Sequence, residues 1–313
     1  FMYTRLFALL LCVMTLPAFA NQCKTINFGI VDWTDVRVTT AVAQVLLEKL
    51  GYEIEVSEHS VDGVYNELAS GNLDAFLGNW MPTMASIVEP HLQQSKIESL
   101  SMNLDNAKYT LAVPSYVYDA GVKTFADLAK HKDKFDGRIY GLEKGNDGNL
   151  LIQKMIDKND FGLKPFRLYA TSERIMLAQV KRRIRDDKWI AFLAWTPHPM
   201  NTQYDIRYLA GGDDYFGPNF GGSTVHTNIR KGLASNCPNV ARFLSNLKFD
   251  VKMEGQLMGQ VMNEFIPADR AVRDWMHKNP KQVSIWLKGV TQADGGEVDF
   301  VKVAQSLKLS FDS

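Results

Sequence analysis

The sequence predicts an α/β protein made of two lobes, and three features of the chain carry that prediction. Short apolar strands alternate with amphipathic helices in a first run, and the same alternation restarts farther along the chain. A mostly helical tail follows, with Pro238, Pro267 and Pro280 near helix starts, where proline is tolerated. Since strand–helix–strand units form parallel sheets with right-handed crossovers, each run predicts a sheet flanked by helices.

The first run begins with a strand at residues 25–31. Apolar residues at helical spacing predict a helix over 36–50, which Gly51 ends. The run continues with strands at 52–56 and 73–78 and a helix at 61–69. The second run contains strands at 108–113, 138–142, 166–170, 189–195 and 223–229, and helices at 125–131, 149–157 and 172–184.

Composition limits the classes of partner. The chain has 313 residues, with 35 Lys and Arg against 35 Asp and Glu, so its formal net charge is zero. That balance gives no electrostatic signature of nucleic acid or of an anionic membrane surface. A hydrophobic fraction of 46% and a charged fraction of 22% are typical of a globular protein, and the length allows about two domains.

The first twenty residues have the pattern of a secretory signal peptide. Arg5 gives a positive start, residues 6–16 are apolar, and Ala18-Phe19-Ala20 is a small-x-small cleavage site. The apolar run is too short for a spanning helix, which needs about 20 residues. We therefore expect cleavage near Ala20 and an exported, periplasmic protein.

Removal of the signal peptide leaves Cys23 and Cys237. An even number of cysteines in an oxidising compartment favours a disulfide, although two separately buried thiols are the alternative. A bridge would place the helical tail with the first run of strands. The expected organisation is a signal peptide at 1–20, lobe one at 21–110 plus 215–313, and lobe two at 111–214.

Aromatic residues recur at the ends of the predicted strands. Trp33, Trp80 and Trp195 lie at carboxyl ends of predicted parallel strands, and Tyr109 lies where the chain first crosses between lobes. Ligands of open α/β sheets bind outside these strand ends. For any single Trp, closure of the core is the simpler interpretation. Four aromatics at matching places favour a ligand pocket in a cleft between the lobes.

Several aromatic faces that converge on one point suit a quaternary ammonium group, which has no N–H donor and is attracted to ring faces by about 0.5–2 kcal/mol each. Asp35 would supply a formal charge, balancing choline and repelling the carboxylate of glycine betaine. Alternatively, Asp35 caps the helix that follows it. In the loop Gly145–Asn149, Asn146 either donates to a ligand hydroxyl or forms a turn and helix cap.

Signals for catalysis and for metal or cofactor binding are weak. The six His are scattered, and neither H-E-x-x-H nor G-x-S-x-G occurs. His198, between two prolines, is interpreted as structural or as a residue that supports the ligand contacts from behind. The basic run of Lys181, Arg182, Arg183 and Arg185 is followed by two Asp, which favours a solvated helix face over a nucleic-acid patch.

From residue 28 to 289 the chain resembles the periplasmic substrate-binding proteins of ABC transporters for choline and glycine betaine, and most closely the choline-binding member. The motifs that carry this resemblance are Trp33-Thr34-Asp35, the segments 76–84, 107–111 and 145–149, Trp195-Thr196-Pro197-His198-Pro199-Met200-Asn201, and Gly211-Gly212-Asp213-Asp214.

The resemblance implies a two-lobed binding protein of type II, with two inter-lobe crossings and a Cys23–Cys237 bridge. It implies an aromatic box with two polar contacts and a membrane permease as partner; the six box and contact residues are Trp33, Trp80, Tyr109, Trp195, Asp35 and Asn146. Binding of a betaine (or acetylcholine), a chemoreceptor partner, and an enzyme on the same fold with a free thiol nucleophile stay open as alternatives.

Overall fold

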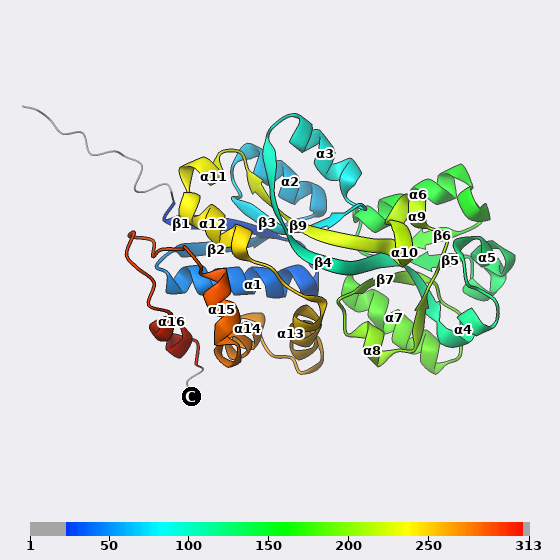
Figure 1. Ribbon diagram of the computed structural model, residues 1–313. Coiled ribbons are helices and arrows are strands. Elements are labelled where there is room, and N and C mark those ends of the chain that lie inside the picture. Colours follow the sequence, from blue (N-terminus) through cyan, green and yellow to red (C-terminus); the bar gives the residue numbers. More distant parts are fainter. Residues whose placement is uncertain (1–22, 309–313) are drawn as a thin grey trace, which may run out of the picture.

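Two lobes joined by two long strands make up the computed structural model, which describes residues 23–308 (Figure 1). The strands are β4 (Ile97–Pro114) and β9 (Gly222–Arg230), which pair antiparallel and run from one lobe into the other. Together they link all nine strands in the order β2-β1-β3-β9-β4-β7-β5-β6, with β8 paired to β4. The two-lobed α/β prediction with two inter-lobe crossings is therefore confirmed.

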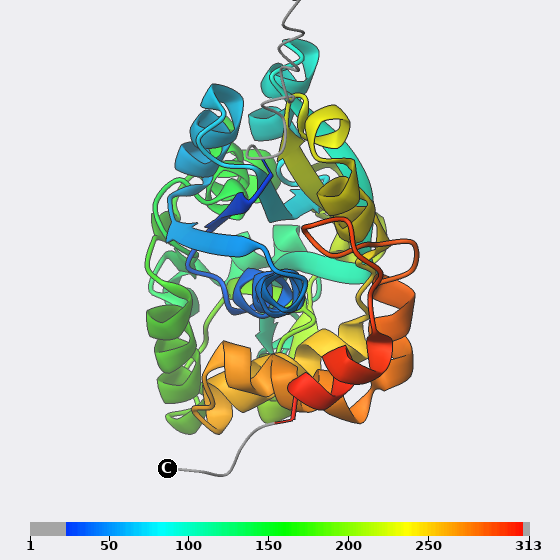
Figure 2. The same ribbon diagram turned by 90° about the vertical axis from the view of Figure 1, so that its left-hand side faces the viewer.

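The first lobe contains the parallel strands β1 (Thr25–Ile30), β2 (Glu53–Glu58) and β3 (Ala75–Met81), with β1 in the middle. Its N-terminal helices are α1 (Thr34–Lys49), α2 (Val61–Ser70) and α3 (Ala85–Gln93). The side chains of Val38, Val42, Val45 and Leu46 on α1 are buried. This helix lies between the sheet and the C-terminal helices, and Figure 2 views it end-on.

The second lobe is built on β5 (Arg138–Tyr140), β6 (Arg167–Tyr169), β7 (Phe192–Thr196) and β8 (Ile206–Tyr208), with β5 parallel to both β6 and β7. Its helices are α4 (Ser115–Asp119), α5 (Phe125–Lys130), η2 (Lys132–Phe135), α6 (Asp147–Lys158), η3 (Asp160–Gly162), α7 (Glu173–Arg185), α8 (Met200–Gln203), α9 (Asp213–Phe216) and α10 (Pro218–Gly221).

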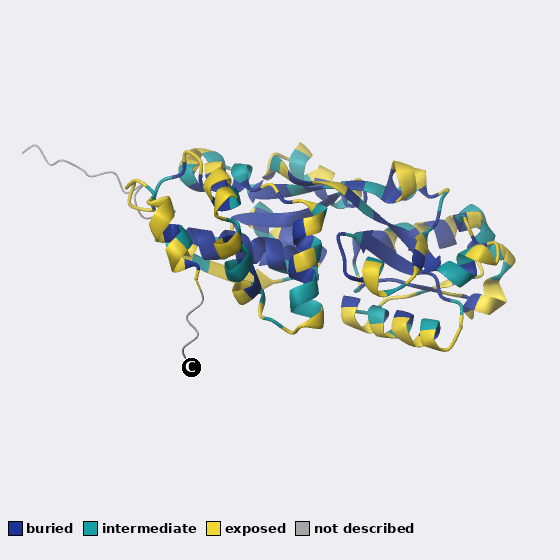
Figure 3. Ribbon diagram, turned by 60° about the horizontal axis from the view of Figure 1, so that its bottom comes forward, coloured by how far each residue is buried: buried dark blue, intermediate teal, exposed yellow. Residues whose placement is uncertain are grey.

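After β9 the chain returns to the first lobe as a series of helices. These are α11 (Leu233–Asn236), α12 (Pro238–Asn246), α13 (Val251–Asn263), α14 (Ala268–Lys278), α15 (Pro280–Trp286) and α16 (Phe300–Ser306). A disulfide between Cys23 and Cys237 ties this return to the start of β1, which confirms the expected pairing. Buried residues concentrate in the sheet and α1, and exposed ones on the outer helices (Figure 3).

The structure corrects several element predictions. The strand expected at 108–113 begins at Ile97, because residues 97–107, which mix buried apolar and exposed polar side chains, pair along β9. The helix at 85–93 has no counterpart in the sequence analysis; it contains Pro90 and buries only Val88. The strand expected at 189–195 begins at Phe192, and Trp189 precedes it.

Two side chains outside the site have packing roles. The Trp189 ring lies 4.4 Å from the Lys134 ammonium, as measured to the ring centroid. In the basic run on α7, Arg183 is buried and forms an ion pair with Asp136 at 2.7 Å. The expected solvated face therefore excludes Arg183, which anchors α7 to the turn before β5.

The expected signal peptide lies outside the described residues. Within residues 23–308, no helix has both the length and the apolar character needed to cross a bilayer. The lobe boundaries near residues 110 and 215 stay a prediction; residue 110 lies within β4 and residue 215 within α9.

Removal of the bridge tests how far it stabilises the first lobe. Since it closes a loop of 214 residues in the unfolded chain, the double variant Cys23→Ser/Cys237→Ser should lose about 2–4 kcal/mol of unfolding free energy in urea denaturation. An unchanged free energy would contradict this prediction. Ser235→Ala, an exposed change close to Cys237, is the control.

Candidate ligand-binding site

One cavity brings together the six residues that the sequence analysis singled out. It is lined by Trp33, Asp35, Trp80, Tyr109, Asn146 and Trp195, together with Leu142 and Asp147. Among the described residues that line it, none is Lys, Arg or His. Aromatic and acidic side chains therefore make up most of the cavity wall.

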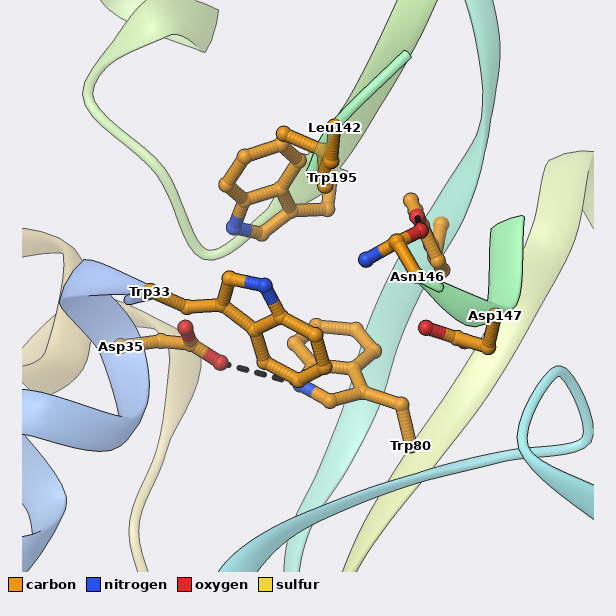
Figure 4. A pocket seen from close by; sticks show the side chains of 8 residues that line it. Trp33, Asp35, Trp80, Leu142, Asn146, Asp147 and Trp195 are labelled. Carbon is orange, nitrogen blue, oxygen red and sulfur yellow. Dashed lines mark hydrogen bonds between the residues drawn. The ribbon is translucent and has the colours of Figure 1, made fainter. Parts of the chain in front are cut away.

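The aromatic walls come from both lobes and from a crossing strand. Trp33 precedes α1 and Trp80 lies near the end of β3, whereas Trp195 lies on β7 directly opposite Tyr109 on β4. Ring centroids are 5.9 Å apart for Trp80 and Tyr109 and 6.2 Å for Tyr109 and Trp195, with steep interplanar angles of 66° and 85°. Figure 4 shows the three indoles around a shared space.

Tyr109 is held by a close fit against α6. Its hydroxyl donates to Asn146 Oδ1 at 2.9 Å, and its ring packs edge-on to Phe216. A Cβ at Gly148 would lie 2.3 Å from the Tyr109 hydroxyl oxygen, so a glycine is required there. The Gly145–Asn149 loop therefore shapes the pocket wall.

Asp35 presents a buried carboxylate beside the rings. Its Oδ2 accepts a hydrogen bond from Trp80 Nε1 at 2.9 Å (Figure 4). Burial, with the negative charge of Glu173, raises the pKa of Asp35 to about 7, although the Trp80 bond favours the charged form. The N-cap of α1 is Trp33, so the alternative role of Asp35 as the cap is wrong.

Asn146 has the helix-cap role considered for it, and its contact with a ligand stays a prediction. It is the N-cap of α6, with Oδ1 accepting from the Gly148 and Asn149 amides at 2.9 and 3.3 Å. Its Nδ2 group faces the cavity (Figure 4). Asn149 holds the same loop in place, since its side chain bonds to both backbone groups of Leu142.

Sequence reasoning missed two lining residues, Leu142 and Asp147, and Asp147 is the charged one. It is 1% exposed, and neither carboxylate oxygen accepts a hydrogen bond of good geometry from a described residue. Burial raises its pKa to about 6, even though the Thr83 hydroxyl and the first amides of α6 favour the charged form. As a helix-start Asp in the Gly145–Asn149 loop it looked like an ordinary first-turn residue.

Further groups surround the site without lining it. The His198 ring packs edge-on against Trp195, with centroids 4.6 Å apart, which agrees with its structural interpretation. Glu254 on α13 is buried near Asp35, and burial raises its pKa well above the ordinary value. Within residues 23–308, no cluster of three or more His, Cys, Asp or Glu is arranged to hold a metal ion. Cys23 and Cys237 are bonded to each other, which removes the thiol nucleophile of the enzyme alternative.

A small, largely aromatic pocket between two lobes, which are joined by two strands, is typical of a ligand-binding protein. The family described as the substrate-binding domain of the ABC-type glycine betaine transport system matches residues 24–278. The chain belongs to this family of extracytoplasmic transport receptors.

Similarity to solved structures supports the same family assignment. An ABC-transporter choline binding protein in complex with choline is 46% identical, with a TM-score of 0.89 over 91% of this chain and 99% of that one. An ABC-transporter choline binding protein in an unliganded, semi-closed conformation gives a TM-score of 0.84 at the same identity and coverage. A glycine betaine/carnitine transport binding protein of Listeria monocytogenes is 27% identical over 172 residues, which are 55% of this chain and 56% of the relative.

The hydrogen bond that Trp80 donates to Asp35 leads to a testable prediction about the pKa of Asp35. Trp80→Phe removes a donor that favours the charged carboxylate, so the pKa of Asp35 should rise further above about 7 in the ligand-free protein. A pH titration of labelled aspartate carboxyl carbons by NMR measures it. Trp275→Phe, in a ring pair with Trp286 away from the pocket, is the control; an equal Asp35 pKa in both variants would refute the prediction.

Proposed function

We propose that this protein is an exported receptor that binds choline in the cavity and delivers it to an ABC transporter permease. The observation that carries the proposal is a single cavity with four aromatic walls and two buried carboxylates, and with no basic side chain among its described lining residues. The 46% identity to a choline binding protein supports the same ligand. Signal-peptide cleavage near Ala20 would place the receptor in the periplasm.

Choline matches the pocket in charge and polarity. Its trimethylammonium group has no hydrogen-bond donor, and aromatic faces attract it at about 0.5–2 kcal/mol each when desolvated, or roughly 2–8 kcal/mol for four. Since micromolar binding needs about 8 kcal/mol net, the carboxylates of Asp35 and Asp147 supply the further attraction. The Asn146 Nδ2 group, which faces the cavity and makes a 3.4 Å bond to Glu143 Oε1, would donate to the choline hydroxyl.

Glycine betaine is the second candidate, and the raised pKa of Asp35 is the observation that favours it. A carboxyl group with a pKa of about 7 is partly protonated near neutrality, and its proton can bond to the betaine carboxylate. Against this, the described lining residues include no cation to pair with that carboxylate. We expect no chemical change in the ligand, because a transport receptor releases it intact.

Removal of one aromatic wall tests the cage. Trp195→Ala should weaken choline binding by about 100-fold in titration calorimetry, because it loses a ring face together with its buried apolar area. Trp189→Ala, in the same lobe but outside the cavity, should leave the affinity unchanged. If the two variants bind equally well, Trp195 is not part of the cage.

The two carboxylates should set the preference between choline and betaine. Asp147→Asn keeps the shape of the side chain but removes its charge, so choline binding should weaken about tenfold while glycine betaine binding weakens less or improves. Asp186→Asn, at the exposed end of α7, is the matched control. A constant ratio of the two affinities would exclude Asp147 from ligand selection.

The pH dependence separates the two ligands. A cation binds the ionised form of Asp35 and Asp147 more strongly, so choline affinity should fall about tenfold or more as the pH is lowered from 8 to 5.5, through pKa values of about 7 and 6. At pH 7, binding should release protons, measurable by calorimetry in buffers of different ionisation enthalpy. Affinity that rises with acidity would favour betaine instead.

A further inference from the structure

The start of α1 is hydrogen-bonded to the second lobe. Trp33 Nε1 donates to Glu143 Oε1 at 3.0 Å. The amide and the hydroxyl of Thr34 donate to Glu173 Oε2 and Oε1, both at 3.0 Å. These bonds join residues that are 110 and 139 positions apart in the sequence and that lie on opposite sides of the cleft. The bonds therefore exist only when the lobes are together.

Helix α1 has no cap of its own. Thr34 is its first residue, and the N-cap Trp33 offers no side-chain acceptor. The first amides of a helix need acceptors from outside the helix, and its N-terminus favours negative charge. Glu173 meets both requirements from the other lobe, because its carboxylate is 5% exposed and bonded directly to the Thr34 amide.

His198 holds the Glu173 carboxylate in place. Its Nδ1 accepts from the Met200 amide at 2.9 Å, which leaves Nε2 as the donor to Glu173 Oε1 at 3.0 Å. Both residues belong to the second lobe, so this bond survives when the lobes separate. Glu173 is therefore preorganised to receive Thr34, and His198 also contacts the cage ring of Trp195.

We propose that Glu173 is a positioning residue that caps α1 across the cleft and thereby holds the closed form around the ligand. Thr34 lies between Trp33 and Asp35, so a bond to Thr34 fixes a cage ring and a pocket carboxylate together. Glu173 itself does not line the cavity. It acts on the lifetime of the complex, because its bonds to Thr34 must break before the ligand leaves. The ligand named here rests on the proposed function.

Stopped-flow tryptophan fluorescence measures this role. Glu173→Gln and Glu173→Ala should release choline about 10-fold and about 100-fold faster than the unmodified protein, with association changed less than threefold. Thr34→Val, which removes one of the two bonds from the first lobe, should give an intermediate increase. Asp157→Asn, an exposed carboxylate change on α6, is the control and should match the unmodified protein.

Closure is measured separately, as energy transfer between dyes on the two lobes. The Glu173 variants and Thr34→Val should lower the closed fraction both with and without ligand, whereas a merely structural defect would lower thermal stability and leave the closed fraction unchanged. Unaltered release and closure in these variants would overturn the proposal. Failure of the unmodified protein to bind choline would refute the proposed function alone, since ligand-free closure still tests Glu173.

Discussion

Negative charge buried among aromatic rings is the feature on which the rest of the structure depends. Asp35 and Asp147 are almost fully enclosed, and burial raises the pKa of both above the ordinary range of a carboxyl group. The ligand-free pocket therefore holds charge away from water at a cost in free energy. A permanently positive ligand with an apolar surface offsets that cost and fills the space between the rings, which explains why acidic and aromatic groups occur here together.

The two-lobed fold completes the acidic, aromatic pocket only when the lobes are closed. Each lobe supplies part of the cage, and within residues 23–308 the chain passes between the lobes along β4 and β9, so the walls meet when the lobes do. The contacts of Glu173 and Glu143 with the start of α1 lie beside the cage rather than within it. Affinity is thus divided between groups that attract the ligand and groups that keep the lobes together around it. The greater similarity to a choline-bound structure than to a semi-closed one agrees with a closed form.

The sequence predicts much of this arrangement because strand ends meet at a sheet edge. That rule brings Trp33, Trp80 and Trp195 to one place without knowledge of side-chain geometry. It does not reveal Asp147, because a helix-start Asp has the same appearance whether its carboxylate faces solvent or a cavity. Nor does it reveal the first half of β4, whose polar residues form a strand because they pair with β9. The role of Glu173 is hidden as well, because its partner Thr34 lies 139 residues earlier in the chain. Local sequence patterns do not show contacts between residues that are far apart in the chain.

The most direct test of the cage compares choline with 3,3-dimethyl-1-butanol, in which a carbon replaces the charged nitrogen without changing the shape. Titration calorimetry of both ligands at pH 8 separates attraction for positive charge from the burial of methyl groups. A cage of aromatic faces with ionised Asp35 and Asp147 attracts positive charge. Choline is therefore expected to bind at least about 100-fold more tightly than the neutral alcohol. Equal affinities would contradict a cation-binding cage.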